Sequence, residues 1–441
     1  MENFKSYQIY IDSGIKWIGL IPKHWKVTKY KRLFNFINGN GFPERFQGKN
    51  EGEFPFYKVS DINFRGKMIT SAINYVSLDD LKGNKWNIVK PNSILTAKIG
   101  EALKKNHRKI NQKNCLIDNN MMALSLNKGS LDYYYYFLSI VDMDWYSNPG
   151  TVPSINMRNL REDNLLIPSL EEQDQIAKFL NIKVSQIDDL IVDKEKLIEL
   201  LEEKRQAIIT EAVTKGLNPN VKMKDSGVEW IGEIPEHWEK VKLRYIGEAI
   251  IGLTYSPTDV TSEDKGDLVL RSSNIKDGKI IYGNNVYVDR DIPEKLRVKN
   301  GDIIICSRNG SRELIGKCAL IDKESEGHSF GAFTTVFRSE CNNFLYYVFQ
   351  SQLFKAQIGS FLTSTINQLT IGNLYSFPIA LPNMDEQKKI VDYLKNKTTD
   401  IDSTIDEQRI IIEKLKEYRQ SLIYEAVTGK IDVRDYKKVL S

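Results

Sequence analysis

Apolar residues recur with a heptad period between residues 170 and 213. One heptad position holds Leu180, Ile187, Leu201 and Ile208, and the other holds Ala177, Val184, Ile191, Ile198 and Ala212. This spacing predicts a long helix with a coiled-coil seam. Ser169 and Glu172 form a capping pattern that starts the helix, and Gly216 with Pro219 ends it. At 1.5 Å per residue the helix would be about 66 Å long, so we expect it to separate the parts of the chain on either side.

The same pattern returns near the C-terminus. Adding 214 to each residue number carries Glu172-Gln173 onto Glu386-Gln387 and Glu211-Ala212-Val213 onto Glu425-Ala426-Val427. The second seam holds Val391, Leu394, Ile401, Ile405, Ile412, Leu415 and Leu422. Polar residues interrupt both seams in the same layers, Lys194 with Gln408 and Arg205 with Arg419. Since a polar seam residue usually fixes register or partner choice at a cost in stability, we expect the two helices to pack on each other with a pseudo-twofold relation.

A second repeat precedes each globular segment. Residues 12–25 and 225–238 share the pattern DSG, then W-I-G, then I-P and H-W, and we call this segment the HW motif. We interpret His24 and His237 as packing and capping residues rather than catalytic ones. The chain is therefore predicted to be a tandem duplication, with a first domain over 1–166, a central helix over 167–217, a second domain over 218–378 and a C-terminal helix over 379–441.

The interior of each domain reads as mixed α/β. Predicted strands cover residues 54–59, 268–271, 303–306, 319–321 and 334–337, and predicted helices cover 131–140 and 344–353. The aromatic run at 133–137 has the composition of a base-stacking platform. In a helix these side chains point in all directions, so core packing is the interpretation we favour. Ile94 to Gly100 aligns with Ile304 to Gly310, whereas the surrounding residues barely match, which suggests related tasks on different targets.

The formal net charge of +4 is unevenly distributed. Lys and Arg outnumber Asp and Glu by 21 to 13 over residues 25–166, but the balance is 7 to 11 over 167–216 and 17 to 16 over 238–377. A basic first domain suggests a polyanionic partner, although proteins that bind none also carry such a surplus.

Catalytic signatures are missing from the sequence. It has no GxxxxGK(S/T) phosphate loop, GxGxxG loop, HExxH pair, GxSxG elbow, or NPP(Y/F) and DPPY segments of amino-methyltransferases. The four cysteines have no C-x-x-C spacing, so we expect reduced thiols, no metal site and a cytoplasmic protein. No stretch has the length and apolarity of a membrane span. We expect neither a catalytic centre nor a resident cofactor.

What remains is recognition of a partner. Lys98 and Arg308 are aligned at a strand end, a basic loop follows the first of them, and matching polar loops precede the long helices. Such side chains suit contacts to phosphates and base edges, while the alternatives are a solvated surface loop and ordinary turns. The candidate DNA contacts are Lys98, Lys104, Lys105, Arg108, Ser154 and Asn156 in the first domain, and Arg271, Arg308, Asn309, Thr363, Thr365, Asn367 and Gln368 in the second.

Taken together, the chain resembles the specificity subunits of type I restriction-modification enzymes. The residues that carry the resemblance are the two HW motifs, the helix starts Ile167-Pro168…Glu172-Gln173 and Leu381-Pro382…Glu386-Gln387, and the helix ends beginning at Glu211 and Glu425. These motifs span nearly the whole chain, in the same order twice.

The resemblance implies a mixed α/β protein with two target-recognition domains held apart by two conserved helices in an antiparallel coiled coil. Each domain would bind one half of an asymmetric bipartite site in double-stranded DNA, and the helices would set the spacer. Two methyltransferase subunits would dock on the helices and two restriction subunits would join them, so that S-adenosylmethionine, ATP and Mg would be bound by the partners. The competing hypotheses are a stand-alone DNA-binding regulator, which binds tightly without partners, and a coiled-coil scaffold, which has no salt-dependent DNA affinity.

Overall fold

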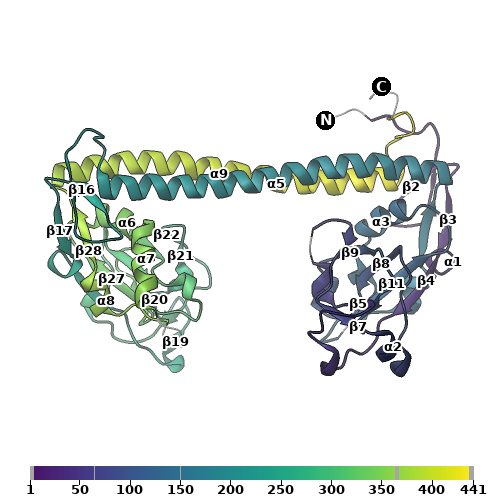
Figure 1. Ribbon diagram of the computed structural model, residues 1–441, viewed down its shortest axis with the longest axis horizontal. Coiled ribbons are helices and arrows are strands. Elements are labelled where there is room, and N and C mark those ends of the chain that lie inside the picture. Colours follow the sequence, from purple (N-terminus) through teal and green to yellow (C-terminus); the bar gives the residue numbers. More distant parts are fainter. Residues whose placement is uncertain (1–3, 64, 149, 363–366, 437–441) are drawn as a thin grey trace. The chain divides into compact units, whose positions relative to one another are not determined.

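The computed structural model describes residues 4–63, 65–148, 150–362 and 367–436. The chain forms two compact units, residues 1–193 with 411–441 (unit 1) and residues 194–410 (unit 2). Figure 1 shows that each unit contains one globular domain and one half of each of two long helices, α5 and α9. Unit 1 is thus assembled from both ends of the chain, whereas unit 2 is a single continuous stretch.

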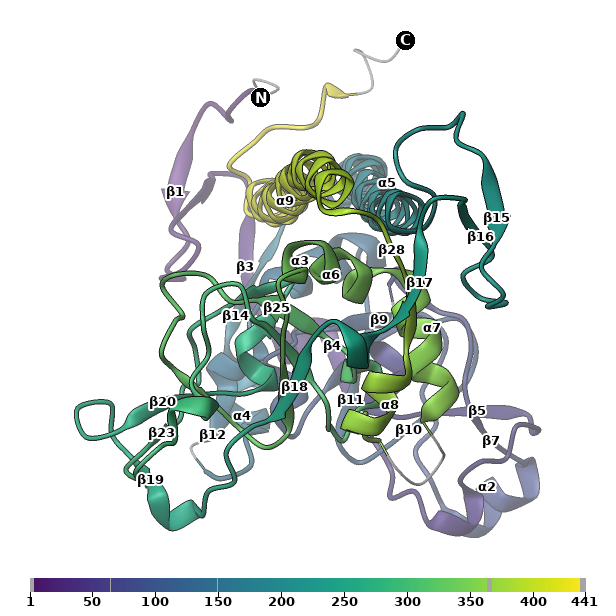
Figure 2. The same ribbon diagram turned by 90° about the vertical axis from the view of Figure 1, so that its left-hand side faces the viewer.

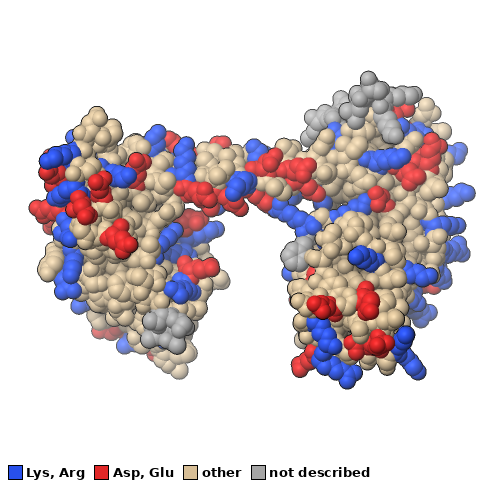
Figure 3. Space-filling view, in the orientation of Figure 1, with Lys and Arg blue, Asp and Glu red and all other residues tan. Residues whose placement is uncertain are grey.

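The two long helices are α5 (Leu170–Lys215) and α9 (Met384–Val427), so both predicted helices are confirmed. They lie side by side in the end-on view of Figure 2, and acidic side chains gather along them in Figure 3. In unit 1 the first half of α5 packs on the second half of α9, and in unit 2 the second half of α5 packs on the first half of α9. The helices are therefore antiparallel, as predicted.

Most of the predicted seam is buried. The buried seam residues are Ala177, Leu180, Val184, Ile187, Ile191 and Ala212 on α5, and Leu394, Ile401, Ile405, Ile412 and Leu422 on α9. Leu201 and Leu415 are half-buried, as is Lys194, whereas Gln408 is buried. The seam is thus buried along α9 into its middle at Ile405, whereas Leu201 on α5 and Leu415 on α9 are partly exposed.

Ion pairs occupy the layers of the two seam arginines. In unit 2, Arg205 Nε lies 2.9 Å from Asp402 Oδ1, and in unit 1, Arg419 Nε lies 2.8 Å from Asp188 Oδ1. Adding 214 to Asp188 gives Asp402, so the two pairs are related by the repeat. Neither Nε–H is aligned as a hydrogen bond, so these are mainly ionic contacts. Each seam arginine is therefore compensated by an aspartate of the other helix. The prediction that Arg205 and Arg419 share a layer is wrong, because in the antiparallel pair one lies in unit 2 and the other in unit 1.

The domain of unit 1 is built on two sheets. The larger has the order β4-β11-β8-β9-β6, antiparallel except for β6 and β9, and the smaller has the order β10-β5-β7. Their bounds are β4 Phe34–Asn38, β11 Met121–Leu126, β8 Ser93–Ala97, β9 Arg108–Asn111, β6 Met68–Ile69, β10 Leu116–Ile117, β5 Phe54–Tyr57 and β7 Asn74–Val76. Its other elements are β1 Tyr10–Asp12, β2 Leu20–Pro22, β3 Lys26–Lys29, β12 Ser147–Asn148, β13 Ser154–Ile155, β14 Asn164–Ile167, α1 Tyr30–Leu33, α2 Leu78–Asn84, α3 Leu131–Ile140 and α4 Met157–Glu162.

The domain of unit 2 repeats this plan. Its sheets have the orders β18-β27-β24-β25 and β19-β23-β20-β26. Their bounds are β18 Glu248–Ile251, β27 Thr334–Arg338, β24 Ile303–Cys306, β25 Cys318–Leu320, β19 Val260–Thr261, β23 Tyr287–Val288, β20 Asp267–Leu270 and β26 Ser329–Phe330. The remaining elements are β15 Met223–Asp225, β16 Glu233–Pro235, β17 Glu239–Lys242, β21 Ile275–Lys276, β22 Lys279–Ile280, β28 Pro378–Leu381, α6 Asn342–Gln350, α7 Gln352–Phe361 and α8 Ile371–Ser376.

The predicted strands and the helix at 131–140 are confirmed within a residue or two. The helix predicted over 344–353 is interrupted, because Ser351 is extended and its hydroxyl accepts from Phe354 N to cap α7. In the aromatic run, Tyr133, Tyr134, Tyr136 and Phe137 are buried. Core packing is therefore the correct interpretation of this run, and a stacking platform is excluded for these four rings.

The HW motif closes each unit against the helix pair. In unit 1, Glu172 on the first turn of α5 accepts from the Ser169 hydroxyl at 3.0 Å and from Trp25 Nε1 at 3.3 Å, and its Oε1 lies 2.8 Å from His24 Nε2. Burial raises the pKa of Glu172, but the hydrogen bonds from these three residues outweigh it and leave the pKa below its ordinary value. In unit 2, His237 Nε2 lies 2.9 Å from Glu386 Oε2. Each histidine thus pairs with a glutamate in the first turn of a long helix, and the absence of a catalytic role stays a prediction.

Glycines end both long helices at the same motif. Gly216 has a φ of +74° and a Cβ there would lie 3.2 Å from the Trp238 ring. Gly429 has a φ of +71° and a Cβ there would lie 2.4 Å from Pro22 Cδ and 3.1 Å from the Trp25 ring. Because positive φ and a close approach both favour glycine, each HW motif packs where one long helix ends and the other begins.

Candidate nucleic-acid interface

In unit 1 the strand-end cation and the polar loop lie together. Lys98 directly follows β8, and Ile155 N in the loop donates to Lys98 O at 3.0 Å. Ile99 and Ser154 form an isolated antiparallel bridge. Lys98 and Ser154, predicted separately from the sequence, thus belong to one surface, and we call residues 98–100 with residues 153–156 the first strand-end surface.

Unit 2 has the equivalent second strand-end surface, residues 307–310 with residues 367–369. Leu369 N donates to Ser307 O at 2.8 Å, and Arg308 forms an isolated antiparallel bridge with Gln368. The Arg308 guanidinium lies 5.2 Å from the centre of the Phe333 ring, and Phe333 is 59% exposed. An exposed arginine on an exposed aromatic ring presents a flat cationic surface to a partner.

The predicted equivalence of Lys98 and Arg308 is wrong by one residue. The carbonyl that accepts from the loop belongs to Lys98 in the first domain and to Ser307 in the second. The residue that bridges to the loop is Ile99 in the first and Arg308 in the second. The strand pairing supports this shift of one residue, because Ala97 pairs with the first residue of β11 and Cys306 pairs with the first residue of β27. The two cations therefore occupy consecutive rather than equivalent positions.

Three first-domain candidates have different local roles. The Asn156 side chain accepts from Arg158 N and Asn159 N at 3.1 Å each, so it caps α4. Lys104 is exposed and pairs with Glu101 at 2.8 Å, a contact that raises the pKa of Lys104. Lys105 is exposed. The two lysines are accessible to a phosphate, whereas the Asn156 carbonyl oxygen is occupied by the helix.

Arg108 does not lie on the surface of the predicted basic loop. It is 5% exposed, and its guanidinium donates to the carbonyl oxygens of His107 and Val141 at 3.0 and 3.1 Å and to Asn106 Oδ1 at 2.7 Å. Burial lowers the pKa of Arg108 to about 10. In this structure Arg108 is part of the fold and does not present its charge to solvent.

The second-domain candidates are held by local hydrogen bonds. Arg271 Nη2 donates to Asn284 O at 2.6 Å, and Asn309 Nδ2 donates to Ser272 Oγ at 3.3 Å. Asn367 Nδ2 donates to Gly310 O at 3.2 Å, and Gln368 is half-buried. Thr363 and Thr365 lie outside the described residues. Base contact by any of these side chains stays a prediction.

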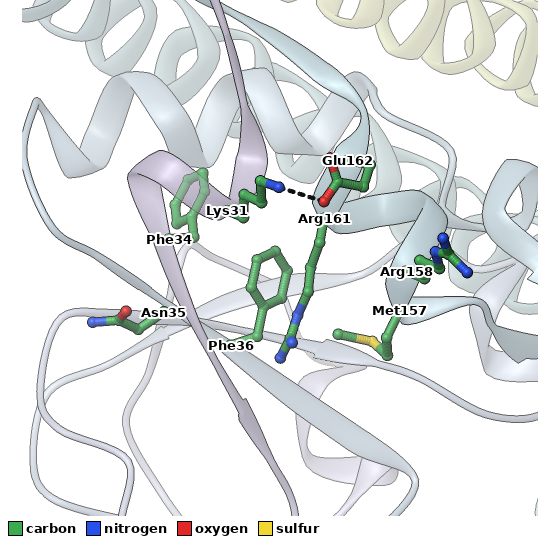
Figure 4. Close-up of a pocket in the computed structure, with 8 residues that line it drawn as sticks. All are labelled: Lys31, Phe34, Asn35, Phe36, Met157, Arg158, Arg161 and Glu162. Atoms are coloured by element: carbon green, nitrogen blue, oxygen red, sulfur yellow. Dashed lines mark hydrogen bonds and ion pairs between the residues drawn. The ribbon is translucent and has the colours of Figure 1, made fainter.

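A basic cavity beside the first strand-end surface was not predicted. It has a volume of about 580 Å³ and is lined by Lys31, Phe34, Asn35, Phe36, Met157, Arg158, Arg161 and Glu162 (Figure 4). The sequence signal was two arginines directly after the polar loop. The sequence alone does not place these arginines beside β4, because only the fold brings the two segments together.

No three His, Cys, Asp or Glu side chains gather as metal ligands in the part of the chain that the structure describes. None of its helices combines the length and apolarity needed to cross a membrane. The fold and site together define a duplicated recognition protein whose two copies carry different polar surfaces on one scaffold.

Comparisons with known proteins identify the family. A family model described as type I restriction modification DNA specificity domain matches residues 22–202 and 235–418. The chain therefore belongs to this family, and its role is that of a DNA specificity subunit.

Individual relatives agree. The type I restriction enzyme MjaVIII specificity subunit of Methanocaldococcus jannaschii is 27% identical over 452 residues, covering 98% of this chain and 97% of that protein. The EcoKI specificity subunit of Escherichia coli K12 is 30% identical over 207 residues, 45% of this chain and 44% of its own length. A solved chain described under the words "complex assembly and conformational transition of the type I R-M system" has a TM-score of 0.69 at 14% identity, over 92% of this chain and 98% of that one, and so has the same fold. The predicted fold class is confirmed.

Proposed function

We propose that each globular domain binds one half of an asymmetric bipartite site in double-stranded DNA. The observation that carries the proposal is the pair of strand-end surfaces, which have the same backbone pairing but different side chains. Lys98 and Ser154 form the first, whereas Arg308, Asn309, Asn367 and Gln368 form the second. Because cations and amides contact phosphates and base edges, the two half-sites differ in sequence.

We further propose that α5 and α9 set the spacer and dock two methyltransferase subunits. Exposed apolar side chains on the helices support this, since a contiguous group of such side chains marks an interaction site. They include Leu190, Val192 and Ile411 in unit 1, and Leu197, Leu200 and Ile410 in unit 2. Shortening both helices by seven residues at matched positions would shorten the spacer and leave both half-sites unchanged. Altered half-sites would contradict the proposal that helix length sets the spacer.

In this proposal the chain itself is not catalytic and acts in the cytoplasm. The methyltransferase subunits bind S-adenosylmethionine and methylate a flipped adenine in each half-site. Two restriction subunits bind ATP and Mg and cleave unmodified DNA. The absence from the sequence of the motifs for these reactions supports the division of labour.

The test is a map of N6-methyladenine in a methylation-free host. The host expresses this chain with its neighbouring methyltransferase, and a parallel culture expresses the methyltransferase alone. We expect a new, asymmetric, two-part motif that requires this chain. If no new motif arises although both proteins co-purify, the specificity function in this partnership fails and a stand-alone regulator becomes the better proposal.

Single substitutions test which domain binds which half of the DNA motif. Lys98→Ala is expected to weaken or relax recognition of one half of the motif, and Arg308→Ala the other. Lys128→Ala is the matched control, because Lys128 is exposed and follows the opposite end of β11 from Lys98. Equal loss on both halves would instead assign Lys98 and Arg308 a general electrostatic role.

A further inference from the structure

Two arginines extend the first strand-end surface along an edge strand. Arg158 and Arg161 lie on α4, which begins directly after the capping residue Asn156. Both side chains are exposed. The Arg161 guanidinium lies 5.2 Å from the centre of the Phe36 ring on β4, and Figure 4 shows it extended alongside that ring.

Strand β4 connects these arginines to Lys98. Residues two apart on a strand share a face, so Phe36 and Asn38 lie on the same side of β4. Lys98 Nζ donates to Asn38 Oδ1 at 3.4 Å. The order Lys98, Asn38, Phe36, Arg161 is therefore a continuous row along the sheet edge, which we call the β4 row.

The charge of the row is not cancelled locally. Glu162 is the acidic residue of the cavity, and it is paired with Lys29 at 2.7 Å and Lys31 at 2.5 Å. Hydrogen bonds from these two lysines lower the pKa of Glu162 to about 2. Neither Arg158 nor Arg161 forms an ion pair with any residue that the structure describes. Both guanidinium groups are thus available to an anionic partner.

The second domain has no such arginines. The repeat offset of 214, fixed by the caps Asn156 and Thr370, places Gly372 at Arg158 and Tyr375 at Arg161. The Tyr375 hydroxyl accepts from Ala249 N at 3.0 Å. Ala249 lies opposite Phe337 on β27 as Phe36 lies opposite Leu124 on β11, so it is the counterpart of Phe36. In the second domain the counterpart of Arg161 is therefore an uncharged tyrosine whose hydroxyl already forms a hydrogen bond within the domain.

We propose that Arg158 and Arg161 bind the phosphodiester backbone of the duplex beside the half-site of the first domain, a contact that the second domain lacks. This inference rests on the proposed function. The guanidinium on the Phe36 ring keeps its N–H edge free, which suits bidentate binding of a phosphate. A backbone contact carries no base information, so it contributes affinity and orientation rather than sequence choice.

The experiment compares wild type with an Arg158→Gln/Arg161→Gln variant, each assembled with the methyltransferase. Binding is measured to a duplex with the mapped motif and to a random-sequence duplex of equal length, at several salt concentrations. Each lost phosphate contact should lower the slope of log affinity against log salt by about 0.9. We expect a decrease of about 1 to 2 on both duplexes, with the methylated motif unchanged. Arg161→Lys should retain most of the slope, and Lys128→Gln should leave it unchanged.

The outcomes separate this inference from the proposed function. A variant with wild-type affinity and slope, while wild type still recognises its motif, overturns the arginine contact and leaves the proposed function standing. A changed base preference in one half-site also overturns it, because the arginines would then contact bases. If the wild-type assembly methylates no motif and binds duplexes of different sequence with equal affinity, the proposed function fails and this inference with it.

Discussion

Removing Arg205 from α5 is expected to destabilise unit 2 more than removing Arg419 from α9 destabilises unit 1. The two arginines form equivalent pairs, at 2.9 Å with Asp402 and at 2.8 Å with Asp188. The Arg205 side chain is 15% exposed and that of Arg419 is 34% exposed. Arg205 Nη2 also donates to Gln350 Oε1 at 3.1 Å.

The expected coupling free energy of each pair follows from the exposed fraction of its arginine side chain. Two unit charges 4 Å apart attract by about 4 kcal/mol at an effective dielectric constant of about 20, but exposed pairs typically retain only about 0.2–1 kcal/mol. We expect a coupling free energy of about 0.5 kcal/mol for Arg419 with Asp188 and about 1–2 kcal/mol for Arg205 with Asp402, where solvent screens less. Arg205→Ala should lose roughly 1 kcal/mol more through the hydrogen bond to Gln350.

Double-mutant cycles with alanine at both partners measure these couplings, read out by hydrogen exchange of peptides from each unit. The matched control is Lys416 with Glu413, an exposed pair on α9 at 2.8 Å, which should couple by no more than about 0.5 kcal/mol. Because the two seam pairs belong to different units, their effects should add. Equal coupling in both seam pairs, or a control pair as strong as Arg205 with Asp402, would refute the reasoning from burial.

Other changes test the closure of the units and the buried arginine. Gly429→Ala should destabilise unit 1 by more than about 1 kcal/mol, because of its positive φ and close neighbours, and Gly216→Ala should cost less in unit 2 because its contacts are longer; thermal unfolding of the two variants decides the order. Arg108→Ala should cost roughly 2–4 kcal/mol in urea unfolding by leaving carbonyl oxygens unpaired, whereas Lys104→Ala should be neutral in stability, and the reverse order would contradict the burial argument. Because the pKa of Glu172 is lowered on folding, its stabilising effect is complete above the unfolded pKa, near about 4.3, and is lost as pH falls through the folded value. Glu172→Gln should therefore be less stable at neutral pH and show a weaker loss of stability on acidification, and an unchanged acid transition would count against this role.

The sequence contained enough information for the helix pair. A heptad pattern with caps specifies a helix without tertiary knowledge, and the repeat of the pattern implied the pseudo-twofold packing of α5 on α9. Even the ion pairs were implicit, since Asp188 and Arg205 recur as Asp402 and Arg419. In an antiparallel pair with this symmetry, a register that brings Arg205 to Asp402 must also bring Arg419 to Asp188.

The register of the strand-end surfaces was not available from sequence. Ile303, Ile304 and Ile305 form an apolar run in β24, and such a run slides by one residue without changing its pattern. Only the backbone pairing shows that Arg308 corresponds to Ile99 rather than to Lys98. Arg108 was misjudged for a related reason. A basic cluster is typical of a surface loop, and nothing local indicates that β9 lies inside a sheet with carbonyl acceptors nearby.

The division of the chain into one continuous and one split unit bears on the order in which the protein folds during synthesis. Unit 2 needs only residues 194–410, so all of its contacts are present before the segment 411–441 is made. Unit 1 lacks half of its seam until that segment arrives, including the Val427 carbonyl that accepts from the buried Tyr133 hydroxyl at 3.0 Å. Since domains generally fold as units once their residues are available, the domain that leaves the ribosome first is the last to be completed, and its apolar half-seam on α5 stays uncovered in the meantime.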